Sequence, residues 1–300
     1  MLTRSLPSTI RIGTRRSRLA LAQARLAAAA LRGIVPDTAI VPIATTGDAI
    51  SRRQPRGGWE QTDGQFTRDI ERALLEGRID LAVHSFKDLP IAGVEGLLIA
   101  AVLPRADPRD CLITRDGGSI DRLPVGARVG TSSPRRAAQL RDARPDLRPM
   151  PIRGNLDTRL RRLRAGEYDA VLLAAAGLDR LGIATPQHAR LPLEVCLPAP
   201  AQGALALQVR ADDDALVERL AAVDHPPTRV AVQAERRLLR RVGGGCLAPL
   251  GALAELSGEE LRLRAACDVG DGRIVRAEAR GAADRPDSVI ERVAVEILGP

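Results

Sequence analysis

Short apolar runs and amphipathic segments alternate along most of this chain, and the alternation limits the folds that it can adopt. The segment Thr9-Ile10-Arg11-Ile12-Gly13 predicts a strand, and residues 19–32 predict a helix that Ser17 caps. After a hinge at residues 104–108 the alternation starts again. Strands that alternate with helices are typical of open α/β sheets, so we expect an α/β protein.

The same pattern places further elements before residue 177. Gly77 predicts the end of one helix, and Pro134 suits the first turn of another. The expected helices are 66–77, 134–144 and 156–166. The expected strands are 39–43, 79–83, 97–103, 111–114, 127–130, 147–152 and 168–176.

The last third of the chain is organised differently. A Pro-rich linker at 191–203 precedes a strand at 203–210 and a helix at 213–223. This pair is too short to form a new sheet, so we expect it to complete an earlier one. Beyond Pro226-Pro227 the pattern predicts a small α+β unit. Its expected elements are a helix at 229–242, two or three strands between 251 and 280, and a helix at 286–298.

Composition restricts the partners of the protein. The net charge of +8 favours nucleic acid, an anionic membrane or a polyanionic small molecule. Aromatic residues are only 1% of the chain, which argues against nucleic acid because single-strand binders stack bases on aromatic rings. No apolar run reaches the roughly 18–20 residues that span a bilayer. The four cysteines show neither CxxC nor metal-ligand spacing, so we expect a reduced, cytoplasmic protein without a metal.

Lys87 is the only lysine in the chain. Of the 45 lysine and arginine residues, the other 44 are arginine. A single retained lysine suggests a site that requires a compact ammonium instead of a planar guanidinium. It precedes Asp88, and both follow the apolar run 79–83, where a strand of an α/β sheet would present a ligand site. The alternative is an ordinary surface pair in a turn.

Three loops at the ends of predicted strands combine hydroxyl groups with arginine. They are Thr14-Arg15-Arg16-Ser17, the segment 131–136 and the segment 153–159. Helix N-termini bind anions, and arginine adds bidentate recognition of carboxylate or phosphate. A solvated basic face is the alternative for each loop taken alone.

Cys246 follows three glycines on a predicted bend, with Arg240 and Arg241 nearby. Neighbouring guanidinium groups favour the thiolate, so Cys246 is a candidate reactive thiol. The other cysteines, Cys111, Cys196 and Cys267, lie within apolar runs and are expected to be buried and inert.

Together these segments resemble the porphobilinogen deaminase (hydroxymethylbilane synthase) family over nearly the whole chain. Each motif is weak alone, but their joint occurrence in this order is specific. The motifs are Arg11-Ile12-Gly13-Thr14-Arg15-Arg16-Ser17, Val83-His84-Ser85-Phe86-Lys87-Asp88-Leu89-Pro90, Gly130-Thr131-Ser132-Ser133-Pro134-Arg135-Arg136, Arg153-Gly154-Asn155, Leu197-Pro198-Ala199-Pro200-Ala201-Gln202-Gly203-Ala204 and Gly244-Gly245-Cys246.

The resemblance implies an α/β fold. Two lobes with mixed sheets, similar to type II periplasmic binding proteins, would surround a cleft, and a small α+β domain would follow. The implied domains are residues 1–104 with 203–222, residues 105–202, and residues 223–300.

The resemblance also implies a transferase of porphyrin, tetrapyrrole and heme biosynthesis. Members of the family join four porphobilinogen molecules into hydroxymethylbilane on a dipyrromethane cofactor, releasing ammonia at each step. The implied roles are cofactor attachment by a thioether for Cys246 and catalysis for Asp88, in a cytoplasmic monomer that binds neither nucleic acid nor membrane. The residues implied to bind cofactor and substrate are Lys87, Arg15, Ser17, Gln23, Thr131, Ser132, Ser133, Arg135, Arg136, Arg153, Gly154 and Arg159.

One segment departs from the family pattern. Where members commonly have a Gly-Lys-Gly-Leu-Phe-like stretch, this chain reads Asp63-Gly64-Gln65-Phe66, and an arginine at 52, 53 or 56 would have to replace the lysine. A non-catalytic, two-lobed protein that binds small anions is the alternative function, but it leaves Cys246 unexplained. A basic RNA-binding protein is a third hypothesis.

Overall fold

The computed structural model describes residues 6–47, 64, 66–186, 189–243, 248–270 and 272–299. The chain forms two compact units, and each is described by itself. The first takes its described residues from Met1–Ile50, Thr62–Ala106 and Ala204–Arg229, and the second from Asp107–Gly203 and Val230–Pro300. The division into three domains stays a prediction.

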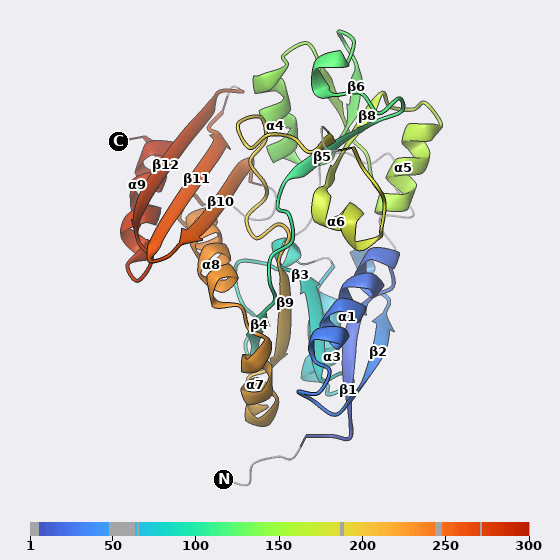
Figure 1. Ribbon diagram of the computed structural model, residues 1–300, viewed down its shortest axis with the longest axis vertical. Coiled ribbons are helices and arrows are strands. Elements are labelled where there is room, and N and C mark those ends of the chain that lie inside the picture. The colour runs from blue at the N-terminus through green and yellow to red at the C-terminus, as the bar shows by residue number, and fades with distance from the viewer. Residues whose placement is uncertain are drawn as a thin grey trace. The chain divides into compact units, whose positions relative to one another are not determined.

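The first unit is built on a mixed sheet of five strands. They are β1 (Thr9–Arg15), β2 (Asp37–Ile43), β3 (Leu81–Ser85), β4 (Leu97–Val102) and β9 (Leu205–Arg210) (Figure 1). Their order is β2-β1-β3-β9-β4, with β1 parallel to β2 and β3 and with β9 antiparallel to β3 and β4. β9 therefore completes an earlier sheet, as predicted.

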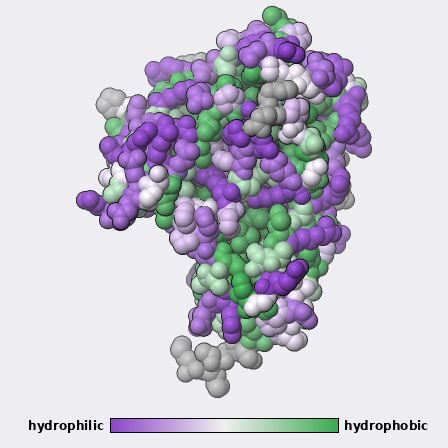
Figure 2. All heavy atoms as spheres, in the orientation of Figure 1, coloured by the Kyte–Doolittle hydropathy of each residue, from purple (hydrophilic) through white to green (hydrophobic). Residues whose placement is uncertain are grey.

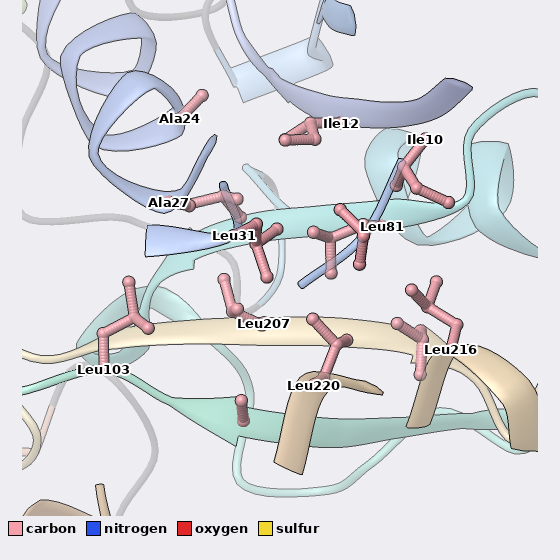
Figure 3. Packing of buried hydrophobic residues seen from close by; sticks show 14 of the residues in the cluster. Ile10, Ile12, Ala24, Ala27, Leu31, Leu81, Leu103, Leu207, Leu216 and Leu220 are labelled. Carbon is pink, nitrogen blue, oxygen red and sulfur yellow. The ribbon is translucent and has the colours of Figure 1, made fainter. Parts of the chain in front are cut away.

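The helices of the first unit bury apolar faces against this sheet. Ser17 caps the first helix as expected, because its Oγ accepts a hydrogen bond from the N–H of Ala20 at 3.2 Å. Buried alanines of that helix, Ala24 and Ala27, pack with Ile12 and Leu207 of the sheet in the cluster of Figure 3. The helices are α1 (Arg18–Ala30), α3 (Arg68–Leu75) and α7 (Asp214–Leu220), with short 3-10 turns η1 (Phe86–Asp88) and η4 (Ala221–Val223).

The second unit contains a mixed sheet of four strands. They are β5 (Asp110–Thr114), β6 (Arg128–Gly130), β7 (Arg148–Met150) and β8 (Ala170–Ala174). In the order β5-β8-β6-β7, β6 is parallel to β7 and β8, while β5 is antiparallel to β8. Its helical elements are η2 (Ile120–Arg122), α4 (Pro134–Ala143), α5 (Leu156–Arg164) and α6 (Ala175–Arg180).

The apolar run 168–176 does not form one strand, so this prediction was wrong at its carboxyl end. β8 ends at Ala174, and helix α6 begins at Ala175. A short apolar run fits a buried strand and a buried helical turn equally well, because periodicity does not separate them.

The end of the chain forms a separate antiparallel sheet within the second unit. Helix α9 matches its predicted bounds, whereas α8 begins three residues before the predicted start because Pro226 and Pro227 occupy its first turn. Glu235 is fully buried and accepts hydrogen bonds from Ala201 N at 2.6 Å and Ala254 N at 2.8 Å. The elements are α8 (Pro226–Arg241), β10 (Leu250–Ser257), β11 (Glu260–Asp268), β12 (Ile274–Ala282) and α9 (Pro286–Leu298).

The expected fold class is thus confirmed as α/β with two mixed sheets and a small α+β segment at the end. Figure 2 shows hydrophilic residues over most of the visible face, with a hydrophobic area over the first unit. Among the described residues, no helix is both long and apolar enough to cross a membrane.

Candidate functional site

In the first unit, polar side chains gather where β1 and β3 end. The two strands are parallel neighbours, so their carboxyl ends lie at the same edge of the sheet. The side chains there line a cavity of about 60 Å³. Four predicted site residues are among those that line it, namely Arg15, Ser17, Gln23 and Asp88.

Asp88 lies in a turn that the chain holds in place on both sides. Phe86, which opens this turn, is buried, and its N–H donates a hydrogen bond to Ala204 O at 3.1 Å. Leu89, which follows the turn, is buried as well. Asp88 and Lys87 themselves are partly exposed, but only Asp88 lines the cavity. The structure therefore brings the predicted carboxylate to the site, with the single lysine as its chain neighbour.

Arg15 is positioned by an aromatic ring that the sequence did not single out. The guanidinium carbon of Arg15 lies 4.0 Å from the centre of the Phe66 ring, and both residues line the cavity. A cation over a ring face is favourable, and stacking also orients the planar group. Phe66 is thus a functional candidate that was missed, because aromatic residues were considered only as a sign of base stacking.

Ser17 and Gln23 also have bonds within the unit. Ser17 Oγ is the acceptor that caps α1. Gln23 is buried, and its Nε2 donates a hydrogen bond to Ser85 Oγ at 2.8 Å. Gln23 therefore joins α1 to the end of β3, immediately before the turn that carries Asp88.

A buried polar chain reaches the same cavity from α3 and β9. His84 Nε2 lies 3.0 Å from Gln208 Oε1, and Gln208 Nε2 donates to Glu71 Oε1 at 3.3 Å. Because the amide nitrogen of Gln208 faces Glu71, its oxygen faces His84, which therefore carries its proton on Nε2. Burial lowers the pKa of His84 to about 4, so the imidazole is neutral near pH 7.

Gln208 and Glu71 were not among the predicted site residues. The available signal was a polar residue in the otherwise apolar run Leu205–Val209, since a buried polar group must find a partner. The identity of that partner was not readable, because Glu71 is 137 positions away.

In the second unit, the hydroxyls of the β6–α4 turn make internal bonds. Ser133 Oγ accepts from Arg136 N at 3.4 Å and caps α4. Ser132 Oγ donates to Ile152 O at 2.8 Å, and Thr131 Oγ1 accepts from Ser133 N at 3.2 Å. The Ser132 bond joins the β6–α4 turn to the segment before Arg153, while the other two lie within the turn and the start of α4. Anion binding by the three hydroxyl residues stays a prediction.

Arg135 and Arg136 are buried inside the second unit, and their binding of cofactor or substrate stays a prediction. Their exposed fractions are 3% and 6%. Arg135 Nη1 lies 2.8 Å from Asp110 Oδ2, and Arg136 Nη2 lies 2.6 Å from Asp110 Oδ1. The physical reason is Asp110, a fully buried carboxylate that both guanidinium groups neutralise.

Charge at this cluster does not balance. Burial opposes ionisation of Asp110, but the two guanidinium groups outweigh burial and hold the pKa of the carboxyl well below its usual range. Two buried cations thus face one buried anion, and the Nε atoms of Arg135 and Arg136 have no hydrogen-bond partner within the described structure. Such a site is suited to further negative charge, so the residues present fit a group that carries carboxylates.

The second predicted loop of this unit has a conformation that requires glycine. Gly154 has φ +106°, and a Cβ atom there would lie 2.7 Å from Thr158 Cγ2. Arg159 Nε donates to Gly154 O at 2.9 Å, while Arg153 is partly exposed. The glycine thus allows the close turn from which Arg153 and Arg159 extend.

Arg180 is a further basic residue that the sequence analysis missed. It ends α6, and its Nη2 donates to Gly203 O at 2.6 Å. Burial lowers the pKa of Arg180 to about 10, so it stays protonated at neutral pH.

The described cysteines behave as predicted. Cys111, Cys196 and Cys267 are buried. Burial raises the pKa of Cys111 to about 11 and that of Cys196 to about 12, so neither is a thiolate at pH 7. Burial also raises the pKa of Cys267.

Two predicted features lie outside the described residues. They are the candidate thiol Cys246 and the segment 51–63 with its arginines. The described residues contain no group of three or more His, Cys, Asp or Glu side chains that could hold a metal ion.

Comparison with known families gives two matches that together span most of the chain. Residues 10–218 match the model described as "Porphobilinogen deaminase, dipyromethane cofactor binding domain". Residues 230–299 match the model described as "Porphobilinogen deaminase, C-terminal domain".

Curated relatives agree with these matches. A porphobilinogen deaminase from Desulforudis audaxviator is 49% identical over 290 residues, covering 96% of this chain and 93% of the relative. One from a Roseiflexus species is 47% identical over 292 residues, covering 97% and 96%. Among solved structures, an ABC transporter periplasmic substrate-binding protein from Coxiella burnetii has a TM-score of 0.45 at 16% identity, covering 73% of this chain and 94% of that one.

Proposed function

Because the chain belongs to the porphobilinogen deaminase family, we propose that it is a hydroxymethylbilane synthase. This transferase joins four porphobilinogen molecules head to tail, releases ammonia at each step and frees the linear tetrapyrrole for porphyrin and heme biosynthesis. The observation that carries the proposal is the match of both family domains, including the dipyrromethane cofactor-binding domain, over residues 10–218 and 230–299. The non-catalytic alternative is not favoured, because it requires neither a cofactor domain nor Cys246.

We assign cofactor attachment to Cys246 and catalysis to Asp88. When bound, the dipyrromethane supplies the pyrrole carbon to which the first substrate unit is joined. Loss of ammonia from porphobilinogen leaves a cationic, azafulvene-like electrophile. The carboxylate of Asp88 is held in place by the turn Phe86–Asp88. It stabilises this positive charge and accepts the proton that is released when two pyrrole units are joined.

Basic groups of each unit bind the carboxylates of cofactor and substrate. In the first unit, the Arg15 guanidinium, oriented by Phe66, offers two parallel donors to an acetate or propionate. Lys87 adds a compact ammonium beside Asp88. In the second unit, Arg153 and Arg159 extend from the Gly154 turn, while Arg135 and Arg136 contribute positive charge from within.

Several further properties belong to the proposal. The chain folds as three domains, residues 1–104 with 203–222, residues 105–202 and residues 223–300. It works in the cytoplasm as a monomer, with neither nucleic acid nor membrane as partner. The four cysteines without CxxC spacing support the reduced cytoplasm, and the scarcity of aromatic rings argues against nucleic acid.

The test is covalent mass together with turnover. Intact-mass analysis of the purified protein is expected to show a pyrrolic adduct that Cys246→Ser lacks, and an Ehrlich-type colour reaction is expected to follow the same pattern. Asp88→Asn is expected to keep the adduct and to lose about a hundredfold or more in turnover. Asp37→Asn, on the exposed start of β2, is the matched control and is expected to be normal.

Two results would contradict the proposal. An active wild-type protein without an adduct would reject Cys246 and the cofactor. A near-normal rate for Asp88→Asn, with the adduct present, would reject Asp88 as the catalytic carboxylate.

A further inference from the structure

The second unit contains a cavity that is separate from every residue assigned above. Its volume is about 370 Å³, and β5, α5 and α6 contribute to its lining. Ligand sites typically occupy about 300–1,000 Å³, so the cavity is large enough for a small molecule. No predicted cofactor- or substrate-binding residue lines it.

The inner part of the cavity is apolar. Leu160, Leu163 and Leu178 line it and belong to the hydrophobic core of the unit, with exposed fractions of 7%, 2% and 0%. Ile183 packs against the same cluster. An apolar body that enters such a space gains from removal of its surface from water, and the walls offer few groups to satisfy buried charges.

Among the described residues that line the cavity, the charged ones carry only positive charge. Arg115 and Arg164 line the cavity, and none of the described lining residues is acidic. The side chain of Arg115 is 53% exposed and pairs with Asp169 at 3.5 Å. Arg164 is exposed, and its side chain makes no hydrogen bond or ion pair with the described residues. A guanidinium in this position can bind an anionic group without breaking an existing pair.

We propose that this cavity binds a small amphipathic anion, a ligand with one acidic group on an aromatic or branched hydrocarbon body. The body fills the space between α5, α6 and β5, and the acidic group pairs with Arg164. A ligand with several carboxylates, such as a pyrrole of the proposed reaction, fits less well, because Arg115 is already paired with Asp169 and the inner walls are apolar. The site is thus independent of the proposed function.

The first test is a fluorescence titration of the full chain with 8-anilinonaphthalene-1-sulfonate, which has the proposed chemistry. Saturable one-site binding is expected. Arg164→Gln is expected to weaken it about tenfold, the effect of losing one charge-assisted hydrogen bond. Arg161→Gln removes the same charge from an exposed position of the same helix outside the lining, and its affinity is expected to equal that of the wild type.

The second test adds a like charge at the cavity. Ala184 is exposed and lines it, so Ala184→Glu is expected to fold normally and to repel the anion, with a loss of at least about tenfold. N-phenyl-1-naphthylamine, which keeps the apolar body without the sulfonate, is expected to bind more weakly than the sulfonate. Melting temperatures check that each variant is folded.

Three outcomes would overturn the inference. They are a wild-type titration that does not saturate below about 1 mM, an affinity unchanged in both Arg164→Gln and Ala184→Glu, and equal affinity for the uncharged amine. Arg164→Gln is expected to keep adduct formation and turnover, so failure of the cavity proposal can be told apart from failure of the proposed enzyme function.

Discussion

His84 is a buried imidazole that lines the same cavity as Asp88 and is held neutral by its surroundings. Its Nε2 proton is directed at Gln208, which leaves Nδ1 as an acceptor. A neutral ring at the cavity of the proposed catalytic carboxylate avoids an ion pair that would compete with a cationic intermediate for Asp88. Burial thus keeps the ring neutral, while Gln208, oriented by Glu71, determines which ring nitrogen carries the proton.

This environment predicts a specific pH dependence of folding stability. The pKa of His84 is about 4 in the folded protein and about 6.5 in an unfolded chain. Between these values the unfolded state binds a proton that the folded state does not bind, so the free energy of unfolding falls as pH drops from about 6.5 to about 4. At pH 5 the expected loss relative to pH 7.5 is about 2 kcal/mol.

Urea unfolding of the wild type and of His84→Asn at both pH values measures this loss. At pH 7.5 the variant is expected to have a lower free energy of unfolding than the wild type. Between pH 7.5 and pH 5 its free energy of unfolding is expected to change little. The carboxylates with lowered pKa, such as Asp80 and Asp224, change protonation at lower pH. They therefore do not contribute to the change in stability between pH 5 and pH 7.5. Equal losses in wild type and variant would show that His84 is not responsible.

Lys87 gives a second prediction for a single side chain. An ammonium is a compact charge, while a guanidinium is a planar fork, so Lys87→Arg is not a conservative change at a positioning site. The variant is expected to reduce cofactor assembly or raise KM more than it slows the chemical step in single-turnover experiments. Arg16→Lys, an exposed neighbour of the site, is the control. If Lys87→Arg slows the chemical step while cofactor assembly stays normal, the roles proposed for Lys87 and Asp88 are reversed.

At the scale of elements, the first turn of α4 contains Arg135 and Arg136, at the end where a helix dipole disfavours cations. The structure resolves this conflict with Asp110, which lies at the start of β5 and pairs with both. Gln202 Nε2 donates to the same carboxylate at 2.8 Å. One carboxylate therefore joins β5, α4 and the linker before β9.

Asp110→Asn is expected to cost about 3–5 kcal/mol of unfolding free energy, because two buried cations lose their partner. The double variant Asp110→Asn with Arg136→Met is expected to recover part of the loss by removing one of those cations. Asp169→Asn, whose partners Arg115 and Arg128 are half exposed, is expected to cost about 1 kcal/mol or less. Guanidinium unfolding followed by circular dichroism measures all three. Equal costs for the two single variants would contradict the buried-cluster interpretation.

Most elements were predictable because their ends carry strong local signals. Proline at the first turn fixed the starts of α4 and α9, and the Ser17 cap fixed that of α1. The exception at β8 and α6 shows the limit, since Ala175 and Ala176 continue an apolar run into a different structure. Pairing partners were less predictable than the elements, because they are chosen by tertiary contacts.

The molecule as a whole carries a net charge of +8 while its proposed substrates are anions. Long-range attraction should speed their association and should weaken as salt shortens the Debye length from about 30 Å at 0.01 M to about 10 Å at 0.1 M. We expect kcat/KM to fall several-fold over this range while kcat at saturating substrate changes little. Steady-state kinetics in added KCl, with sucrose as an uncharged control, measures it. A kcat/KM that does not change with KCl concentration would show that local contacts alone determine the rate of substrate association.

The candidate site was predictable only where its residues form a local sequence signal, as was the case for the helices and strands. Motifs that are contiguous in sequence, such as 83–90 and 131–136, were found directly. Asp110 and Gln208 were not, because their partners are distant in sequence: Arg136 is 26 positions from Asp110, and His84 is 124 positions from Gln208. The sequence therefore revealed which groups carry charge, and the fold revealed which of them are already neutralised.

Because Lys87 is the only lysine, its side-chain amine can be modified selectively in the unmodified sequence. An amine-directed acylating reagent meets one side-chain amine in 300 residues, apart from the terminal amine. Acylation of Lys87 appears as a mass increment on the one peptide that contains it, separate from the peptide of the terminal amine and without an engineered label. Shielding of Lys87 from acylation would then report, on the unmodified sequence, when an anion occupies the site next to it.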